Sequence, residues 1–160
     1  MMLRQGKAIR RLEVPKVYWV LVLLGVGIEL SSYWIQILVN TSSSLPQVLF
    51  IVQKGKMPQK GDFVSFVHPV LKTRLVKRVE GVAGDLVTVQ GDKVYISGEF
   101  KGALVPHNSR GEPLVPVKDQ TIEEGAFFVQ GDHERSFDSR YERFGLIPDS
   151  AIEGKAWSPL

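Results

Sequence analysis

The sequence predicts an all-β domain that follows one N-terminal transmembrane helix. A long apolar run begins at Val17, directly after a basic segment. Beyond Asn40 the helical periodicity ends, and short runs rich in β-branched and aromatic residues alternate with Lys-Gly and Gly-Asp turn signals. The chain has 160 residues, which suits one globular domain and little more.

Residues 1–16 form a basic flank, and residues 17–39 are the expected membrane anchor. A helix needs about 20 apolar residues to cross the hydrocarbon core, and the segment from residue 17 to about 37 meets this requirement. Positive charge before the run, with none directly after it, predicts a cytoplasmic N-terminus and an external remainder. A cleaved secretory signal and a buried soluble helix are the alternatives. Glu29, a charge within the run, is expected to face a partner helix or to lie near the outer interface.

Residues 40–160 are expected to form a single β-rich domain of hairpins. The predicted strands are residues 48–52, 63–67, 75–80, 86–90, 93–96, 127–130 and 151–157. Residues 101–124 carry three prolines and few apolar runs, and they are predicted to form an extended excursion or loop.

The composition excludes several kinds of site. The chain has no cysteine, so it has no disulfide, no thiolate metal site and no Cys nucleophile. His68, His107 and His133 have no partner at metal-ligand spacing and are predicted to be surface residues, so neither a metal nor another cofactor is expected. The net charge of +3 comes with basic residues that precede the apolar run, so nucleic acid is not an expected partner.

Lys77 lies in a predicted strand, where a charged residue is unusual. Strand alternation places Leu75, Lys77 and Val79 on one face. An ammonium group that is desolvated among apolar side chains loses affinity for its proton, and a neutral amine can act as a general base. The alternative is an edge-strand lysine whose ammonium reaches water.

Two further polar stretches stand out by position. Residues 40–46 (NTSSSLP) follow the expected anchor, and residues 130–140 (QGDHERSFDSR) have the density of polar groups expected at the wall of a site. Taken alone, the first is an ordinary polar loop and the second is a turn with an Asp–Arg pair.

Together and in this order, the three stretches resemble type I signal peptidases, the Ser/Lys-dyad proteases of the bacterial membrane. Residues 76–85 (VKRVEGVAGD) resemble the lysine box of that family, and residues 131–140 with 144–148 (FGLIP) resemble its C-terminal box. Residues 44–46 (SLP), preceded by Asn40-Thr41, resemble the TraF-type branch, whose members mature a pilin subunit in conjugative transfer. The similarity spans about residues 40–157.

The resemblance implies a role for each of six residues. Ser44 would be the nucleophile and Lys77 its general base, and the Ser44 backbone N–H and the Ser42 hydroxyl would bind the oxyanion. Ser136 would hold the Lys77 amine, and a structural ion pair would lie beside the site. The residues of that pair are Asp138 and Arg140.

The serine loop departs from the usual pattern of the family, and this affects the register of the nucleophile. Ser43 stands three residues before Pro46 and Ser44 two residues before it, and the TraF-type pattern favours Ser44.

The implied function is that of a membrane-bound serine endopeptidase of the inner membrane, with its catalytic domain on the periplasmic side. It would cleave a signal or leader peptide from a translocated precursor, above all a conjugative propilin. Membrane lipid and the conjugation machinery would be its other partners. A pilin cyclase that uses the same dyad and a non-catalytic subunit of a conjugation or secretion apparatus are the alternatives. A self-cleaving repressor is disfavoured, because a membrane helix stands where a DNA-binding module would be needed.

Overall fold

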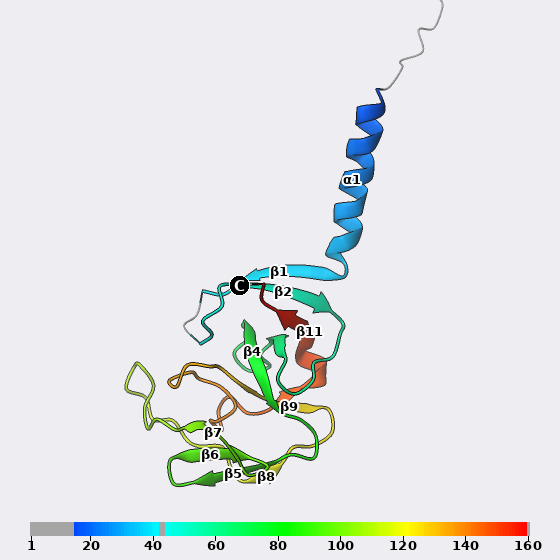
Figure 1. Cartoon of the computed structure of the whole chain (residues 1–160). Coiled ribbons are helices and arrows are strands. Elements are labelled where there is room, and N and C mark those ends of the chain that lie inside the picture. Colours follow the sequence, from blue (N-terminus) through cyan, green and yellow to red (C-terminus); the bar gives the residue numbers. More distant parts are fainter. Residues whose placement is uncertain (1–14, 42–43, 160) are drawn as a thin grey trace, which may run out of the picture. The chain divides into compact units, whose positions relative to one another are not determined.

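The computed structural model describes residues 15–41 and 44–159 and divides the chain into two compact units. The first unit, residues 1–33, contains helix α1 (Lys16–Ser32). The second unit, residues 34–160, contains the strands (Figure 1).

Helix α1 is shorter than the sequence analysis expected. It ends at Ser32, and the hydroxyls of Ser31 and Ser32 donate to the carbonyls of Ile28 and Glu29 in its last turn. Across residues 15–41 and 44–159, no helix reaches the length and apolar character that a bilayer crossing requires.

The prediction that the helix continues to about residue 37 is wrong, because residues Ile35–Val39 form strand β1. Its five residues pair with strand β2 (Leu49–Lys54) in an antiparallel register that joins Ile37 to Ile51. Alternating β-branched residues favour a strand wherever a partner strand is available, and the sequence alone does not show that β2 supplies one.

The second unit is built on two antiparallel sheets. The larger has the order β1-β2-β11-β3-β4-β9-β10, and the smaller has the order β7-β6-β5-β8. The remaining strands of the larger sheet are β3 (Phe63–Val67), β4 (Arg74–Gly81), β9 (Ala126–Gln130), β10 (Ile147–Pro148) and β11 (Ile152–Trp157). The smaller sheet comprises β5 (Leu86–Gln90), β6 (Lys93–Ile96), β7 (Glu99–Ala103) and β8 (Gln120–Thr121). A short 3₁₀ helix, η1 (Asp149–Ala151), precedes β11.

All the predicted strands exist, and those at β3, β5 and β6 have the predicted bounds. The sequence analysis missed β1, β7, β8 and β10. Strand β7 begins immediately after Ser97-Gly98, where both residues have positive φ, as a two-residue hairpin turn requires. The predicted loop over residues 101–124 is therefore wrong for its first three residues, which complete β7, and for the two residues of β8.

Three clusters of buried apolar side chains form the core. The first lies around Val64, Val79 and Val129 and includes the face of β4 that also carries Lys77. The second lies beneath the smaller sheet, around Val94. The third holds Phe50 and Val52 of β2 together with Leu45. Leu45 thereby fixes one end of the serine-rich loop to the core.

His68 is buried, so its assignment to the surface is wrong. The side chain is 1% exposed, and its Nδ1 accepts hydrogen bonds from the backbone N–H groups of Val70 and Leu71, both at 3.1 Å. Because Nδ1 is an acceptor, Nε2 carries the proton and donates to the Phe144 carbonyl at 3.0 Å. Burial lowers the pKa of His68, although the bond to Phe144 opposes this shift. His68 therefore closes a turn as a neutral ring.

Candidate active site

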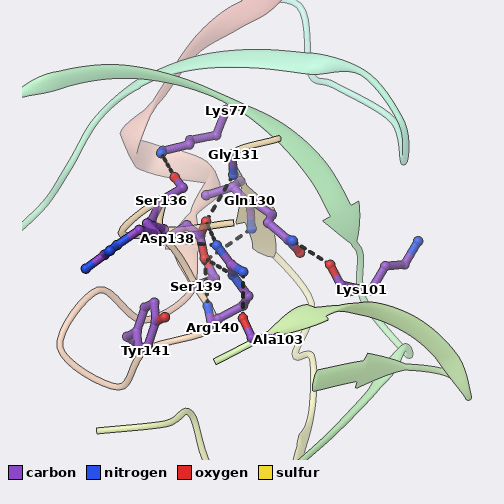
Figure 2. Close-up of polar contacts among 12 residues, drawn as sticks. Lys77, Lys101, Ala103, Gln130, Gly131, Ser136, Asp138, Ser139, Arg140 and Tyr141 are labelled. Carbon is purple, nitrogen blue, oxygen red and sulfur yellow. Dashed lines mark hydrogen bonds and ion pairs between the residues drawn. The ribbon is translucent and has the colours of Figure 1, made fainter. Parts of the chain in front are cut away.

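Lys77 lies in the middle of β4 with its amine inside the domain. The residue is 2% exposed, and its Nζ donates to the Ser136 hydroxyl at 2.5 Å (Figure 2). Lys77 and Val79 are both buried, and the lysine pairs across the sheet with buried Val64, so the predicted apolar face is confirmed. The alternative of an edge-strand lysine that reaches water is excluded.

The surroundings of Lys77 lower the pKa of its ammonium group. Burial lowers its pKa from the ordinary value of 10.5 to about 8. The Asp138 and Asp132 carboxylates act in the opposite direction, and the Arg140 guanidinium lowers the pKa further. Near pH 8 about half of the amine groups are therefore neutral, and a neutral amine can accept a proton.

Asp138 and Arg140 form a buried, bidentate ion pair. Nε and Nη2 of Arg140 lie 2.8 and 2.9 Å from the two carboxylate oxygens, and both side chains are at most 1% exposed. A buried pair of this kind needs further hydrogen bonds to offset its desolvation. Arg140 also donates to the carbonyls of Ser136 and Ala103, and Asp138 accepts from the Gly131 N–H at 3.1 Å. The pair therefore holds the loop that presents Ser136 to Lys77.

The serine-rich loop is held from both sides. The Asn40 side-chain amide donates to the carbonyls of Leu45 and Gln47 at 3.1 and 3.0 Å. The carbonyl of Ser44 accepts from the His133 N–H at 3.1 Å, and Ser44 itself is partly exposed. Ser42, the second expected oxyanion donor, and Ser43 lie outside the described residues.

Gly131 joins the serine loop to the Lys77–Ser136 pair. A Cβ atom at this position would collide with the Ser136 hydroxyl and would lie 2.8 Å from the carbonyl oxygen of Ser44. The Ser44 carbonyl and the Ser136 side chain therefore pack against the same glycine, which places the Ser44 backbone near the Lys77–Ser136 pair. Gly131 belongs to the stretch that resembles the C-terminal box, but the sequence alone assigned it no role. A glycine at this position is required because any side chain would collide with Ser136 and with the Ser44 carbonyl.

Replacing Gly131 with alanine should destabilise the domain by about 1–3 kcal/mol, because the added methyl group overpacks a closed site. Urea unfolding of the purified protein measures this difference. Gly27→Ala is the matched control, since a Cβ at Gly27 meets no atom within 4 Å. Equal unfolding free energies for Gly131→Ala and the wild type would show that Ser44 and Ser136 do not pack against Gly131 as described.

Asp132 is the other residue to which the sequence analysis gave no role. Its carboxylate pairs with Arg78 on the neighbouring strand at 3.0 Å and is one of the charges that raise the pKa of Lys77. Arg78 in turn lies over the ring of Phe63, 4.2 Å from its centre. This chain of contacts fixes the turn at residues 131–133, against which the serine loop rests.

A groove of about 380 Å³ adjoins the site and lies between β1 and the beginning of β4. Residues 38–41 line one wall and residues 73–76 line the other. In the sequence, the first wall ends three residues before Ser44, and the second ends directly before Lys77. We call this hollow the β1–β4 groove. Its two edges of extended backbone suit a peptide that binds as an added strand.

Within residues 15–41 and 44–159, no three side chains of His, Cys, Asp or Glu converge as metal ligands would. The chemistry that this arrangement can perform is nucleophilic attack by a hydroxyl group with an amine as base.

The chain matches one family over most of its length. Residues 12–160 match the family described as "Signal peptidase, peptidase S26". Signal peptidase I of Pseudomonas fluorescens is 29% identical in an alignment 137 residues long. The alignment covers 63% of this chain and 48% of that protein. Signal peptidase I of Bacillus licheniformis is 32% identical over 104 residues, which cover 60% and 55%. The chain thus spans about half the length of the curated relatives it matches.

A solved structure is also similar. The crystal structure of a signal peptidase I from Enterococcus faecalis V583 is 31% identical and covers 62% of this chain and 97% of its own, with a TM-score of 0.43.

Proposed function

Because the chain belongs to the signal peptidase family, peptidase S26, we propose that it is a serine endopeptidase that removes leader peptides from translocated precursor proteins. Its relatives are named signal peptidase I, and the family is one of serine-type hydrolases. The observation that carries the proposal is the buried Lys77 amine, bonded to Ser136 and placed next to the segment that holds Ser44.

In the proposed reaction, Ser44 Oγ attacks the carbonyl carbon of the scissile peptide bond while the neutral Lys77 amine takes the hydroxyl proton. The protonated amine then gives that proton to the departing nitrogen, which becomes the new N-terminus. The leader stays on Ser44 as an ester. Water, deprotonated by Lys77, hydrolyses the ester and restores Ser44. Ser136 keeps Nζ oriented throughout.

The oxyanion of the tetrahedral intermediate needs hydrogen-bond donors at a fixed position. We assign this role to the backbone N–H of Ser44 and to the Ser42 hydroxyl. The support is the loop itself, since buried Leu45 and the two hydrogen bonds from Asn40 leave the Ser44 backbone little freedom to move.

The precursor is proposed to bind in extended form along the β1–β4 groove. Four of the residues that line the groove are apolar, and the other four are polar: Leu38, Val39, Leu75 and Val76, and Asn40, Thr41, Thr73 and Arg74. Small apolar residues before the scissile bond would pack against the apolar part of these walls. The leader side of the substrate is therefore assigned to the groove.

The proposed location is the cytoplasmic membrane, with the basic residues 1–16 on the cytoplasmic side and the β domain outside. An exposed apolar face on β1 supports contact of the domain with lipid. Ile35, Ile37 and Val39 are 48%, 67% and 66% exposed, and Ile37 lies opposite Ile51, which pairs in turn with Trp157. Exposed apolar faces of this kind mark interaction surfaces.

The TraF-type branch is a finer proposal, supported by the short Ser-Leu-Pro loop after Asn40-Thr41. It specifies a propilin as substrate and the conjugation machinery as partner. It also admits attack on the ester by the substrate's own amine, which would give a cyclic product. Intact-mass measurement separates the two outcomes, because hydrolysis adds one water and cyclisation does not.

The function is tested with the purified full chain in detergent and a precursor that carries small residues before a single scissile bond. We expect two products and one new N-terminus, seen by mass spectrometry. A precursor with Trp immediately before the scissile bond is the control and should stay intact. Failure to cleave the first precursor over the pH range 7–10 would refute the proposed activity.

A further inference from the structure

A second cavity adjoins the site at Gly131. It measures about 420 Å³ and is lined by Glu80, Glu99, Phe100, Lys101, Gln130, Gly131 and Asp132. Along β4, the residues of the β1–β4 groove precede Lys77, and Glu80 follows it. Gly131 lies in the wall of this cavity and also packs against Ser44 and Ser136. The cavity therefore shares Gly131 with the proposed site, and its residue on β4 follows Lys77 whereas those of the groove precede it.

The cavity is polar and carries an excess of negative charge. Three carboxylates and one ammonium line it. Lys101 bridges Glu80 and Glu99 at 2.8 and 2.9 Å, and Arg78 pairs with Asp132 from outside the wall. Burial opposes the charge of Lys101, but its bonds to Glu80 and Glu99 outweigh this and raise its pKa, so it stays charged. The three carboxylates, together with the Lys101 ammonium and the Arg78 guanidinium, carry a net charge of −1.

Glu99 is the carboxylate that a ligand meets most easily. Its side chain is 68% exposed, although one oxygen bonds to Lys101. Strand β7 carries Glu99 and Lys101, and Gln130 donates from β9 to the Lys101 carbonyl at 2.6 Å. That bond ties the hairpin of the smaller sheet to the strand that leads into Gly131 (Figure 2).

Gln130 also offers an unused acceptor. Its Oε1 is buried and has no hydrogen-bond partner among the described residues. Unpaired buried acceptors are rare in native proteins, because each one loses its bond to water without a replacement.

We propose that this cavity, here named the exit pocket, binds the first residues of the mature chain after the scissile bond, and that it favours a basic side chain over an acidic one. The inference rests on the proposed function. The β1–β4 groove is assigned to the leader, so the chain beyond the scissile bond has to continue past Lys77. The exit pocket is the cavity that adjoins the site there. Its net negative charge attracts a basic side chain and repels an acidic one.

The test uses precursors that differ only at the first three residues after the scissile bond, with Lys, Ala or Glu at one position at a time. The wild type should cleave the Lys form faster than the Glu form at one or more of these positions, with a ratio of kcat/KM of about three to ten, as expected for a partly exposed charge pair. Glu99→Lys should bring that ratio below one, and Glu99→Gln should give an intermediate value. Because the ratio is internal to each enzyme, a general loss of activity does not affect it.

Glu124→Lys is the matched control. It makes the same change of charge at an exposed glutamate outside the pocket, and it should keep the wild-type ratio. If the wild type cleaves the Ala precursor but shows equal rates for Lys and Glu, or if Glu99→Lys keeps the wild-type ratio, the exit pocket is refuted and the endopeptidase stands. If the wild type does not cleave the Ala precursor, the proposed function fails and the exit pocket fails with it.

Discussion

Replacing Lys77 with methionine should lower kcat for precursor cleavage by about 10²–10⁴-fold, the contribution of a positioned general base. Methionine fills a similar volume without a charge, so the buried position is kept while the amine is lost. Lys56→Met, at an exposed lysine, is the control and should leave kcat unchanged. Cleavage at the wild-type rate by Lys77→Met would show that another group accepts the proton.

The same lysine predicts the pH dependence of the wild type. Attack requires the neutral amine, so kcat/KM should rise with pH through an apparent pKa of about 8 and level off above it. The direction follows from burial, which lowers the pKa of an amine by disfavouring its charged form. A steady-state profile measured from pH 6 to 10 tests this, and a profile without a rise near pH 8 would contradict the role of Lys77.

Replacing Ser44 with alanine should abolish the reaction, lowering kcat by at least about 10³-fold, because the covalent route disappears with the hydroxyl. KM should change little, since the groove residues that hold the precursor remain. Single-turnover measurement of precursor cleavage gives both quantities.

Ser43→Ala is the matched control for Ser44→Ala, since both remove one hydroxyl from the same loop. Ser43→Ala should keep most of the wild-type rate. The reverse pattern, with Ser43→Ala inactive and Ser44→Ala active, would move the nucleophile by one position.

Local sequence pattern was sufficient to predict much of the secondary structure of the β domain. Alternation along β4 predicted that Lys77 faces the core with Val79, and the structure confirms this because both side chains are buried. Strand β7 could have been predicted as well, since Ser97-Gly98 is a hairpin signal between β6 and a run of alternating residues.

Contacts between distant segments could not be predicted from local pattern. Ser136, which bonds to Lys77, is 59 residues away in the chain, and only the resemblance to a family put the two together. The same limit explains the wrong prediction for His68. Its burial depends on the Phe144 carbonyl, which comes 76 residues later.

The segment after the helix shows how a partner strand overrides a local pattern. Residues 35–39 are apolar enough to extend a helix, yet all five pair with β2. The pairing also leaves Ile35, Ile37 and Val39 exposed on one face, which supports the proposed contact with lipid. Neither result follows from hydropathy alone, because both depend on the register with β2.

In the proposed mechanism, Ser44 carries the leader as an ester during the reaction. Acid quenching of the wild type during turnover, followed by digestion and mass spectrometry, identifies the modified residue. We expect a peptide heavier by the mass of the leader less one water, with fragmentation that places the addition on Ser44, and no such peptide from Ser44→Ala. An adduct on another side chain, or full cleavage by Ser44→Ala, would contradict it.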